Sequence, residues 1–531
     1  NVDCPVRLIF EAPTVEQLTI EVIKLMKEGL IALPEMQPVD KSQSLPLSYA
    51  QERLWFIDQY SGGQSHFYNM PVALRLIGQL DVHALEQSFN SLLLRHVSLR
   101  TVFVDDNGEP KQVIQGERIF DLTAQMIGED ELQYTIESMS SEAFDLANGP
   151  VFKVKLFQLN DQEHILFVNM HHIVSDGVSS ALMINELVTA YNAYREGNEP
   201  SLPILKYQYA DFAVWQRKLL TEEKLSEQLD YWKEKLEGIE PLNLPLDKPR
   251  PPKQNYNGDS VSIKLDSELS HQLRQLAKDH SVTMYMLMNA VFSILLSRYS
   301  GQDDIVVGSP IANRHYPGTE NIIGFFVNTL VLRTAIDSNQ SFIQLLENVK
   351  RNALHGYQHQ DIPFEYLVSE LDIERDPSRH PLFQVMLNVL EDTQRHDLDL
   401  NGLIIQPYGE LSSVAKFDLT LTVTTGELVE FSFEYATDLF EKPTITRLMG
   451  HLQNILTSVI ENQTQDVGSI EILSEKEKHK LLVEWNDTVV DYPREKTIHQ
   501  LFEEQVEKSP YNTAIVYEET SLSYQALNQR A

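Results

Sequence analysis

A compact β-like segment ends in two adjacent histidines, and this junction constrains the fold more than any other feature of the chain. HILFVNM (His164–Met170) is followed by HHIVSDG (His171–Gly177) and then by apolar residues at helical spacing up to about Arg195. The pattern predicts a strand, a polar turn and a helix, with glycine in the turn because it accepts backbone angles closed to other residues. Neighbouring side chains at a strand end point in opposite directions. One histidine can therefore face a cavity while the other is tied to the scaffold.

A histidine held in such a turn can exchange a proton near neutral pH, and a nearby carboxylate can fix the orientation of a side chain. An isolated pair of histidines more often satisfies buried hydrogen bonds or binds a metal. Here an aspartate stands four residues after His172 and is followed by glycine and a helix, which favours catalysis. We expect His172 to face the substrate and His171 to face the scaffold.

HHIVSDG resembles the HHxxxDG motif of the condensation domains of nonribosomal peptide synthetases, which belong to the chloramphenicol acetyltransferase-like superfamily. Further segments match this family in its order: LSYAQERLWFIDQY (Leu47–Tyr60), RHVSLRTVF (Arg95–Phe103), YADFAVWQ (Tyr209–Gln216), IGFFVNTL (Ile323–Leu330), HQDIPFE (His359–Glu365) and RDPSRHPLFQ (Arg375–Gln384). The resemblance covers most of the chain, from Leu45 to the 460s. So many ordered matches are hard to produce by chance, and the chain is identified as a member of this family.

Composition agrees with a globular enzyme and disfavours other classes. The net charge of −34 argues against nucleic-acid and anionic-membrane partners, which call for basic surface. No apolar run could span a bilayer, and the single cysteine, Cys4, excludes an internal disulfide and a cysteine-based zinc site. A cytoplasmic location is the natural expectation. The sequence holds no GxSxG, GxxxxGK[ST], GxGxxG or HExxH motif, so serine-hydrolase, nucleotide-hydrolase and dinucleotide chemistry lack support.

Alternating strand-like and helical runs predict an α/β fold, an α+β sandwich. The resemblance implies two chloramphenicol acetyltransferase-like lobes, arranged as a V-shaped pseudodimer with an active-site tunnel between them. Thr14, with Gln17 three residues on, is a plausible helix N-cap in the first segment. The predicted parts are the C-terminal helices of a peptidyl carrier domain (1–33), a linker (34–44), an N-terminal lobe (45–225), a C-terminal lobe (226–466), and a linker with the start of an adenylation domain (467–531).

The resemblance implies a reaction in which the α-amine of an acceptor aminoacyl thioester attacks the thioester carbonyl of a donor. Phosphopantetheine arms of two partner carrier domains, one upstream and one downstream, would present the substrates beside an adenylation domain. The carrier's serine motif is absent, so we expect no phosphopantetheine on this chain, and no metal. LPLSYAQERLWF and IGFFVNTL look most like the subtype that takes an L-configured donor. A thioester is already activated, so help from a positioned imidazole is adequate. Whether His172 removes the proton or orients the amine stays open.

Supporting roles also follow from the resemblance. Asp176 is interpreted as an anchor rather than a second base, paired with an arginine of the second lobe, for which Arg314 in GSPIANR is the candidate. Gly177 is expected to leave room for backbone approach or substrate, or to be a plain turn glycine. Three further residues are expected to line the tunnel or to support it structurally: Asn328, Ser309 and Arg53.

Three alternatives remain at this level. The chain could be an acyltransferase that uses a soluble thioester such as coenzyme A, a relative of the epimerisation type, or a non-catalytic docking platform. The flanking segments argue against the first alternative, and the adenylation-like segment argues against the second. The intact HHIVSDG motif argues against the third.

Overall fold

A computed structural model describes residues 7–27, 34–63, 65–117, 119–371, 376–391, 400–409 and 414–531. Cys4 and Arg375, the first residue of the RDPSRHPLFQ segment, lie outside the described residues. The chain forms two compact units, Asn1–Ile472 and Leu473–Ala531. The larger unit holds the histidine motif and both predicted lobes.

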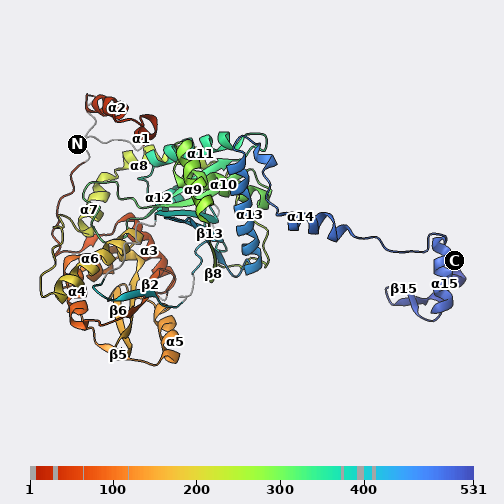
Figure 1. Ribbon diagram of the computed structural model, residues 1–531, viewed down its shortest axis with the longest axis horizontal. Coiled ribbons are helices and arrows are strands. Elements are labelled where there is room, and N and C mark those ends of the chain that lie inside the picture. The colour runs from red at the N-terminus through yellow and green to blue at the C-terminus, as the bar shows by residue number, and fades with distance from the viewer. Residues whose placement is uncertain are drawn as a thin grey trace. The chain divides into compact units, whose positions relative to one another are not determined.

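The first lobe is built on a five-stranded sheet (Figure 1). Its order is β12 (Ile404–Pro407), β2 (Asn69–Ile77), β7 (Glu163–His171), β6 (Phe152–Asn160) and β5 (Ala124–Met126). The helices of this lobe are α3 (Tyr49–Tyr60), α4 (Val82–Arg95), α5 (Glu129–Ser140), α6 (Gly177–Arg195) and α7 (Tyr209–Leu219). A small sheet of β1 (Leu45–Pro46), β4 (Glu109–Ile114) and β3 (Thr101–Asp106) lies beside them, with a 3₁₀ turn, η1 (Val97–Arg100).

Strand β7 is buried on both of its faces, which explains the continuous apolar run of its sequence. Successive side chains of a strand point to opposite faces. Leu166 and Val168 pack in one cluster with residues of α4 and α6, whereas Ile165 and Phe167 pack in another with residues of α5. The strand that delivers the histidines is therefore fixed from above, from below and by two neighbouring strands.

The second lobe is built on a six-stranded mixed sheet. Its order is β10 (Asn328–Ala335), β9 (Asp304–Ile311), β11 (Val385–Glu391), β13 (Leu419–Thr425), β14 (Glu430–Ala436) and β8 (Gly258–Lys264). Its helices are α8 (Glu222–Leu236), α9 (Ser267–Asp279), α10 (Met284–Ser300), α11 (Phe342–Gln358), α12 (Phe364–Glu370) and α13 (Lys442–Glu461). Helix α10 is apolar all round because every side chain from Met286 to Leu296 is buried, as expected for the central helix of a core.

One strand crosses between the lobes. Strand β12 belongs by sequence to the second lobe, yet it pairs antiparallel with β2 in the sheet of the first. In Figure 1 this teal strand lies among the orange and yellow strands of the first lobe. The predicted division after residue 225 locates the bulk of each lobe, and residues 404–407 depart from it because the edge of β2 offers free backbone hydrogen-bonding groups.

The flanking segments form small elements. The first contains α1 (Arg7–Glu11) and α2 (Val15–Lys27), where Gln17 N–H donates to Thr14 Oγ1 at 3.2 Å and Thr14 N–H donates back to Gln17 Oε1 at 3.3 Å, confirming the predicted cap. The larger unit ends near η3 (Val467–Ser469). The smaller unit contains α14 (Glu475–Leu482), η4 (Glu484–Asn486), α15 (Ile498–Lys508), β15 (Thr513–Tyr517), β16 (Thr520–Ser523) and α16 (Tyr524–Arg530).

Within the part of the chain that the structure describes, no single helix is long and apolar enough to cross a membrane. Helices α9 and α10 pass such a test only as a pair, bent by 105°. The expected α/β class with two similar lobes is confirmed.

Candidate active site

The predicted strand, turn and helix around the histidines are present. Strand β7 ends at His171, a single 3₁₀ turn, η2 (His172–Val174), follows, and Asp176 caps α6 by accepting a hydrogen bond from Ser179 N–H at 2.7 Å. The backbone N–H of His171 donates to Val151 O at 3.0 Å, so the end of the strand is tied down.

His171 faces the scaffold of the first lobe. Its side chain is 2% exposed, and Nδ1 accepts the Ile173 N–H at 3.2 Å. Its ring centroid lies 6.4 Å from that of Tyr68 and 6.1 Å from that of Phe144. Burial, with smaller contributions from His172 and Lys416, lowers the pKa of His171 to about 3. A neutral ring buried in this way holds the turn in place.

His172 points its other nitrogen away from the backbone. Its Nδ1 lies 2.7 Å from the carbonyl oxygen of Ser175. A carbonyl can only accept, so Nδ1 carries the proton and the lone pair is on Nε2. The ring packs edge-on against Phe325, with centroids 5.0 Å apart. Burial, with a smaller contribution from Lys416, lowers the pKa of His172 to about 3. The imidazole is thus neutral and able to accept a hydrogen bond at Nε2.

Asp176 and Arg314 form the ion pair expected from the sequence. Arg314 Nη2 lies 3.0 Å from Asp176 Oδ1 and also donates to Ser179 Oγ at 2.7 Å. Phe326 N–H donates to Asp176 Oδ2 at 3.0 Å. With its oxygens occupied by an N-cap, a guanidinium and a backbone amide, Asp176 has no direction left for a substrate. The geometry favours the anchor over the second base.

Arg314 is itself held on several sides. Its Nη1 donates to the carbonyls of Thr319 at 2.9 Å and Ile322 at 2.7 Å, and its Cζ lies 4.0 Å from the centroid of the Phe326 ring. These contacts fix the loop before β10 against the start of α6. The histidine turn is therefore joined to the second lobe by a preorganised charge pair.

The segments YADFAVWQ and IGFFVNTL meet beside this pair. A Cβ on Gly324 would lie 1.8 Å from the ring of Tyr209, so only glycine allows α7 to approach this closely. Tyr209 Oη donates to the carbonyl of Phe325, and Ser179 Oγ donates to the carbonyl of Gly324 at 2.8 Å. Close backbone approach, and not an unusual backbone angle, explains this glycine.

Asn328 serves the scaffold. Its Nδ2 donates to Gln360 O at 2.9 Å and to Ile362 O at 2.8 Å, and its Oδ1 accepts from Phe364 N–H at 3.1 Å. Its side-chain amide is thus used to hold the loop before α12. Of the two roles left open for Asn328, the geometry favours structural support.

Arg53 ties the lobes together, and Ser309 lies within one of them. Arg53 of α3 places Nη1 2.9 Å from Glu365 Oε1 of α12, with its Cζ 5.6 Å from the centroid of Phe364. Ser309 is 5% exposed in β9, where it pairs with Leu330 of β10. The tunnel roles of these residues stay predictions.

Gly177 differs from the expected turn glycine. It is the first residue of α6, outside the left-handed region, so it is not required for an unusual backbone angle. A Cβ built on it would meet nothing within 4 Å, and the residue is exposed. The turn interpretation is wrong because the aspartate before Gly177 already acts as N-cap, and the open space agrees with the alternative of room for a substrate.

Lys416 is a neighbour that sequence reasoning missed. It lies just before β13, and its Nζ sits 4.6 Å from the centroid of the Tyr68 ring. The backbone carbonyl of Tyr68 in turn accepts the His172 N–H at 2.8 Å. Burial lowers the pKa of Lys416 to about 8, while Glu434 acts in the opposite direction. A lone lysine before a strand gives no signal in a single sequence.

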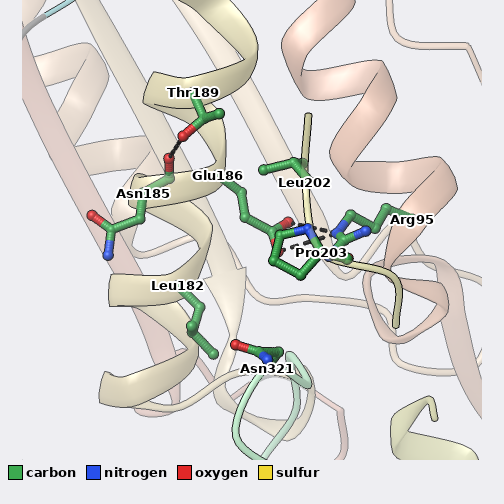
Figure 2. Close-up of a pocket in the computed structure, with 8 residues that line it drawn as sticks. All are labelled: Arg95, Leu182, Asn185, Glu186, Thr189, Leu202, Pro203 and Asn321. Carbon is green, nitrogen blue, oxygen red and sulfur yellow. Dashed lines mark hydrogen bonds and ion pairs between the residues drawn. The ribbon is translucent and has the colours of Figure 1, made fainter. Parts of the chain in front are cut away.

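A cavity of about 200 Å³ lies elsewhere, on the outer side of α6. Figure 2 shows its lining, including Glu186, which accepts from Arg95 Nε at 3.1 Å beside Leu202 and Pro203. Glu186 also contacts His96 Nε2 at 2.7 Å, so its charge is already satisfied. This cavity is separate from the histidine turn, and the chemistry of the site does not involve it.

The family is now shown directly. A model of the condensation-domain family matches residues 41–482. Over its whole length the chain is 42% identical to one of the linear gramicidin synthases of Brevibacillus parabrevis and 40% identical to bacitracin synthase 3 of Bacillus licheniformis. It covers 11% and 8% of those proteins, so it spans about a tenth of the length of the curated relatives it matches.

Solved structures agree on the fold. The X-domain from teicoplanin biosynthesis is 28% identical, with a TM-score of 0.76 over 83% of this chain and 100% of that domain. A four-domain nonribosomal peptide synthetase bound to AMP and glycine is 21% identical, with a TM-score of 0.79 over 94% of this chain and 39% of its own length. The chain belongs to the condensation domains of nonribosomal peptide synthetases. It has their chloramphenicol acetyltransferase-like two-lobed fold, and domains of this family catalyse amide-bond formation.

Proposed function

We propose that this chain joins a carrier-bound donor aminoacyl or peptidyl thioester to the α-amine of a carrier-bound acceptor aminoacyl thioester, by direct transfer at His172. The observation that carries the proposal is the fixed tautomer of His172: Nδ1–H is held by Ser175 O, which leaves the Nε2 lone pair for an incoming N–H. The Asp176–Arg314 pair fixes the same turn from the second lobe.

The role of His172 follows from its protonation state. An α-amine has a pKa near 8, so a neutral fraction is present at cellular pH. A histidine with a pKa of about 3 is too weak a base to deprotonate an ammonium ion beforehand. It orients the neutral amine by accepting an N–H hydrogen bond at Nε2. It takes the proton only as the nitrogen becomes positive on bonding to the carbonyl carbon.

The remaining steps balance without a covalent enzyme intermediate. The amine nitrogen bonds to the thioester carbon, and the carbonyl oxygen becomes an oxyanion. Collapse of this adduct breaks the C–S bond and releases the thiolate of the donor's phosphopantetheine arm, which takes the proton from His172. Holding two tethered substrates together supplies much of the rate enhancement, because effective molarities reach about 10⁵–10⁸ M for well-oriented groups.

The flanking segments support the assignment to a multidomain synthetase. Residues 1–33 would close an upstream donor carrier, and residues 467–531 would open an adenylation domain. The four-domain synthetase covers 94% of the chain, whereas an isolated condensation domain of the calcium-dependent antibiotic synthetase covers 82%. The proposal includes phosphopantetheine arms on partner carriers, an L-configured donor and a cytoplasmic setting.

The test is a condensation assay with purified donor and acceptor carriers, each loaded with an aminoacyl-phosphopantetheine. Amide product on the acceptor carrier, formed only when both loaded carriers and the chain are present, is the expected result. Equal turnover with free coenzyme A thioesters would contradict the need for carriers. A stable acyl adduct on the chain after incubation with the donor alone would contradict direct transfer.

A further inference from the structure

The cations near the histidine turn are not equally compensated. Arg314 is paired with Asp176 at 3.0 Å, and Arg53 is paired with Glu365 at 2.9 Å. Lys416 is half-buried, and no carboxylate oxygen among the described residues lies within ion-pair distance of its Nζ. Burying an ammonium without such a partner is costly, so a lysine kept in this position calls for a use.

The position of Lys416 links it to the reacting end of the site. Its ammonium lies over the face of the Tyr68 ring at 4.6 Å from the centroid, while the Tyr68 carbonyl holds the His172 N–H. Lys416 comes from the second lobe and His172 from the first, so the two side chains approach the lobe junction from opposite sides. A positive charge there complements a negative charge that develops beside His172.

We propose that Lys416 stabilises the oxyanion that forms on the donor carbonyl when the acceptor amine attacks beside His172. This inference rests on the proposed function and deepens it. Attack forms the C–N bond and moves the carbonyl π electrons onto oxygen. The Lys416 ammonium favours that charge, and collapse returns the electrons to the carbonyl as the C–S bond breaks. Lys416 gives up no proton in the cycle, so its contribution is electrostatic.

The ionisable groups around Lys416 decide the pH at which it acts. Arg53 from α3 disfavours the ammonium and Glu434 from β14 favours it. The rings of Tyr68, His171 and His172 face it from the first lobe and are neutral near pH 7. With burial the dominant cause, the pKa of Lys416 is about 8. The ammonium is therefore the main form at cellular pH and is lost in mildly alkaline solution.

The experiment measures single-turnover amide formation with loaded carriers for wild type, Lys416→Met and Lys416→Arg. Lys416→Met removes the charge at similar length and should lower the turnover rate about 10²–10³-fold, the range for loss of one oxyanion donor. KM for both carriers should stay near the wild-type value. Lys206→Met is the matched control, because Lys206 also lies over a tyrosine ring, Tyr207 at 4.9 Å, on an exposed surface. This control should retain wild-type turnover.

Two readouts separate an electrostatic role from a structural one. In NMR titrations the pKa of His172 should rise in Lys416→Met, because a nearby positive charge has been removed. The wild-type rate should fall above pH about 8, whereas Lys416→Arg, whose guanidinium keeps its proton, should lack that fall. The comparison of wild type with Lys416→Arg decides the matter even if Lys416→Met does not fold.

The outcomes are distinguishable. A Lys416→Met turnover within twofold of wild type, or the same high-pH fall in wild type and Lys416→Arg, overturns the role of Lys416 alone. A wild-type chain that forms no amide with loaded carriers overturns the proposed function as well.

Discussion

Arg314 crosses the lobe junction to Asp176, placing its Nη2 3.0 Å from Oδ1 and 3.2 Å from Oδ2. The side chains are 7% and 1% exposed, so the pair is almost completely removed from water. One arginine thereby fixes the cap of α6, the histidine turn and the loop before β10. The position of His172 depends on a contact between residues 138 apart in sequence.

Breaking this pair should destabilise the chain strongly. Asp176→Asn or Arg314→Met leaves a buried charge without its partner, which costs about 3–5 kcal/mol. The double variant should lose less than the sum of the single variants, because the removed charges no longer need each other. Urea unfolding of the four proteins measures the coupling. The exposed pair Glu35–Lys206, at 2.7 Å, is the control and should show no measurable coupling. Strict additivity at Asp176 and Arg314 would contradict the pairing.

The two histidines should fail in different ways. His172→Ala should lower amide formation about 10²–10⁴-fold while the melting temperature stays near wild type, because the ring contributes its lone pair to the reaction. His171→Ala should lower stability by about 1–3 kcal/mol, because it removes a buried ring and its hydrogen bond to the Ile173 N–H. Single-turnover assays and thermal melts on both variants make the comparison. Near wild-type turnover in His172→Ala would remove it from the mechanism.

Acid should unfold the chain through its buried histidines. His171, His172 and His380 each have a pKa lowered by burial from 6.5 to about 3. Between these values the unfolded chain binds more protons than the folded chain, so stability is fully present above pH 6.5 and is lost as pH falls towards 3. Urea unfolding across this range measures the slope. His380→Gln should reduce it by up to about one proton. An unchanged slope would show that His380 titrates alike in both states.

The local architecture could be predicted from the sequence because periodicity is a local property. The apolar run of β7, the helix after it and the N-cap at Thr14 all depend on neighbours a few residues away. The Asp176–Arg314 pair came from the resemblance and not from spacing. Its geometry shows why both residue types are needed: an N-cap carboxylate at one end and a guanidinium shared among carbonyls at the other.

Long-range features could not be predicted in the same way. Strand β12 joins the first lobe from a distant part of the sequence, because an open edge of β2 accepts it. Lys416 becomes notable only when the fold places its ammonium over Tyr68. Asn328 was left between two roles until its three hydrogen bonds to the loop before α12 were visible. Each of these features depends on which distant segments meet.

Gly177 offers a test of where the substrate lies. Its missing side chain faces open space, and its backbone lies in the ordinary helical region, so alanine fits without strain. Gly177→Ala should leave stability unchanged or raise it by up to about 1 kcal/mol, because alanine is the better helix former. If substrate occupies the open space, KM should rise from Gly177→Ala to the larger Gly177→Val. Gly450→Ala in α13 is the matched control, a helical glycine whose added Cβ also meets nothing within 4 Å, and it should leave KM unchanged. A Gly177→Val variant with wild-type KM and turnover would show that the space beside α6 is not used by the substrate.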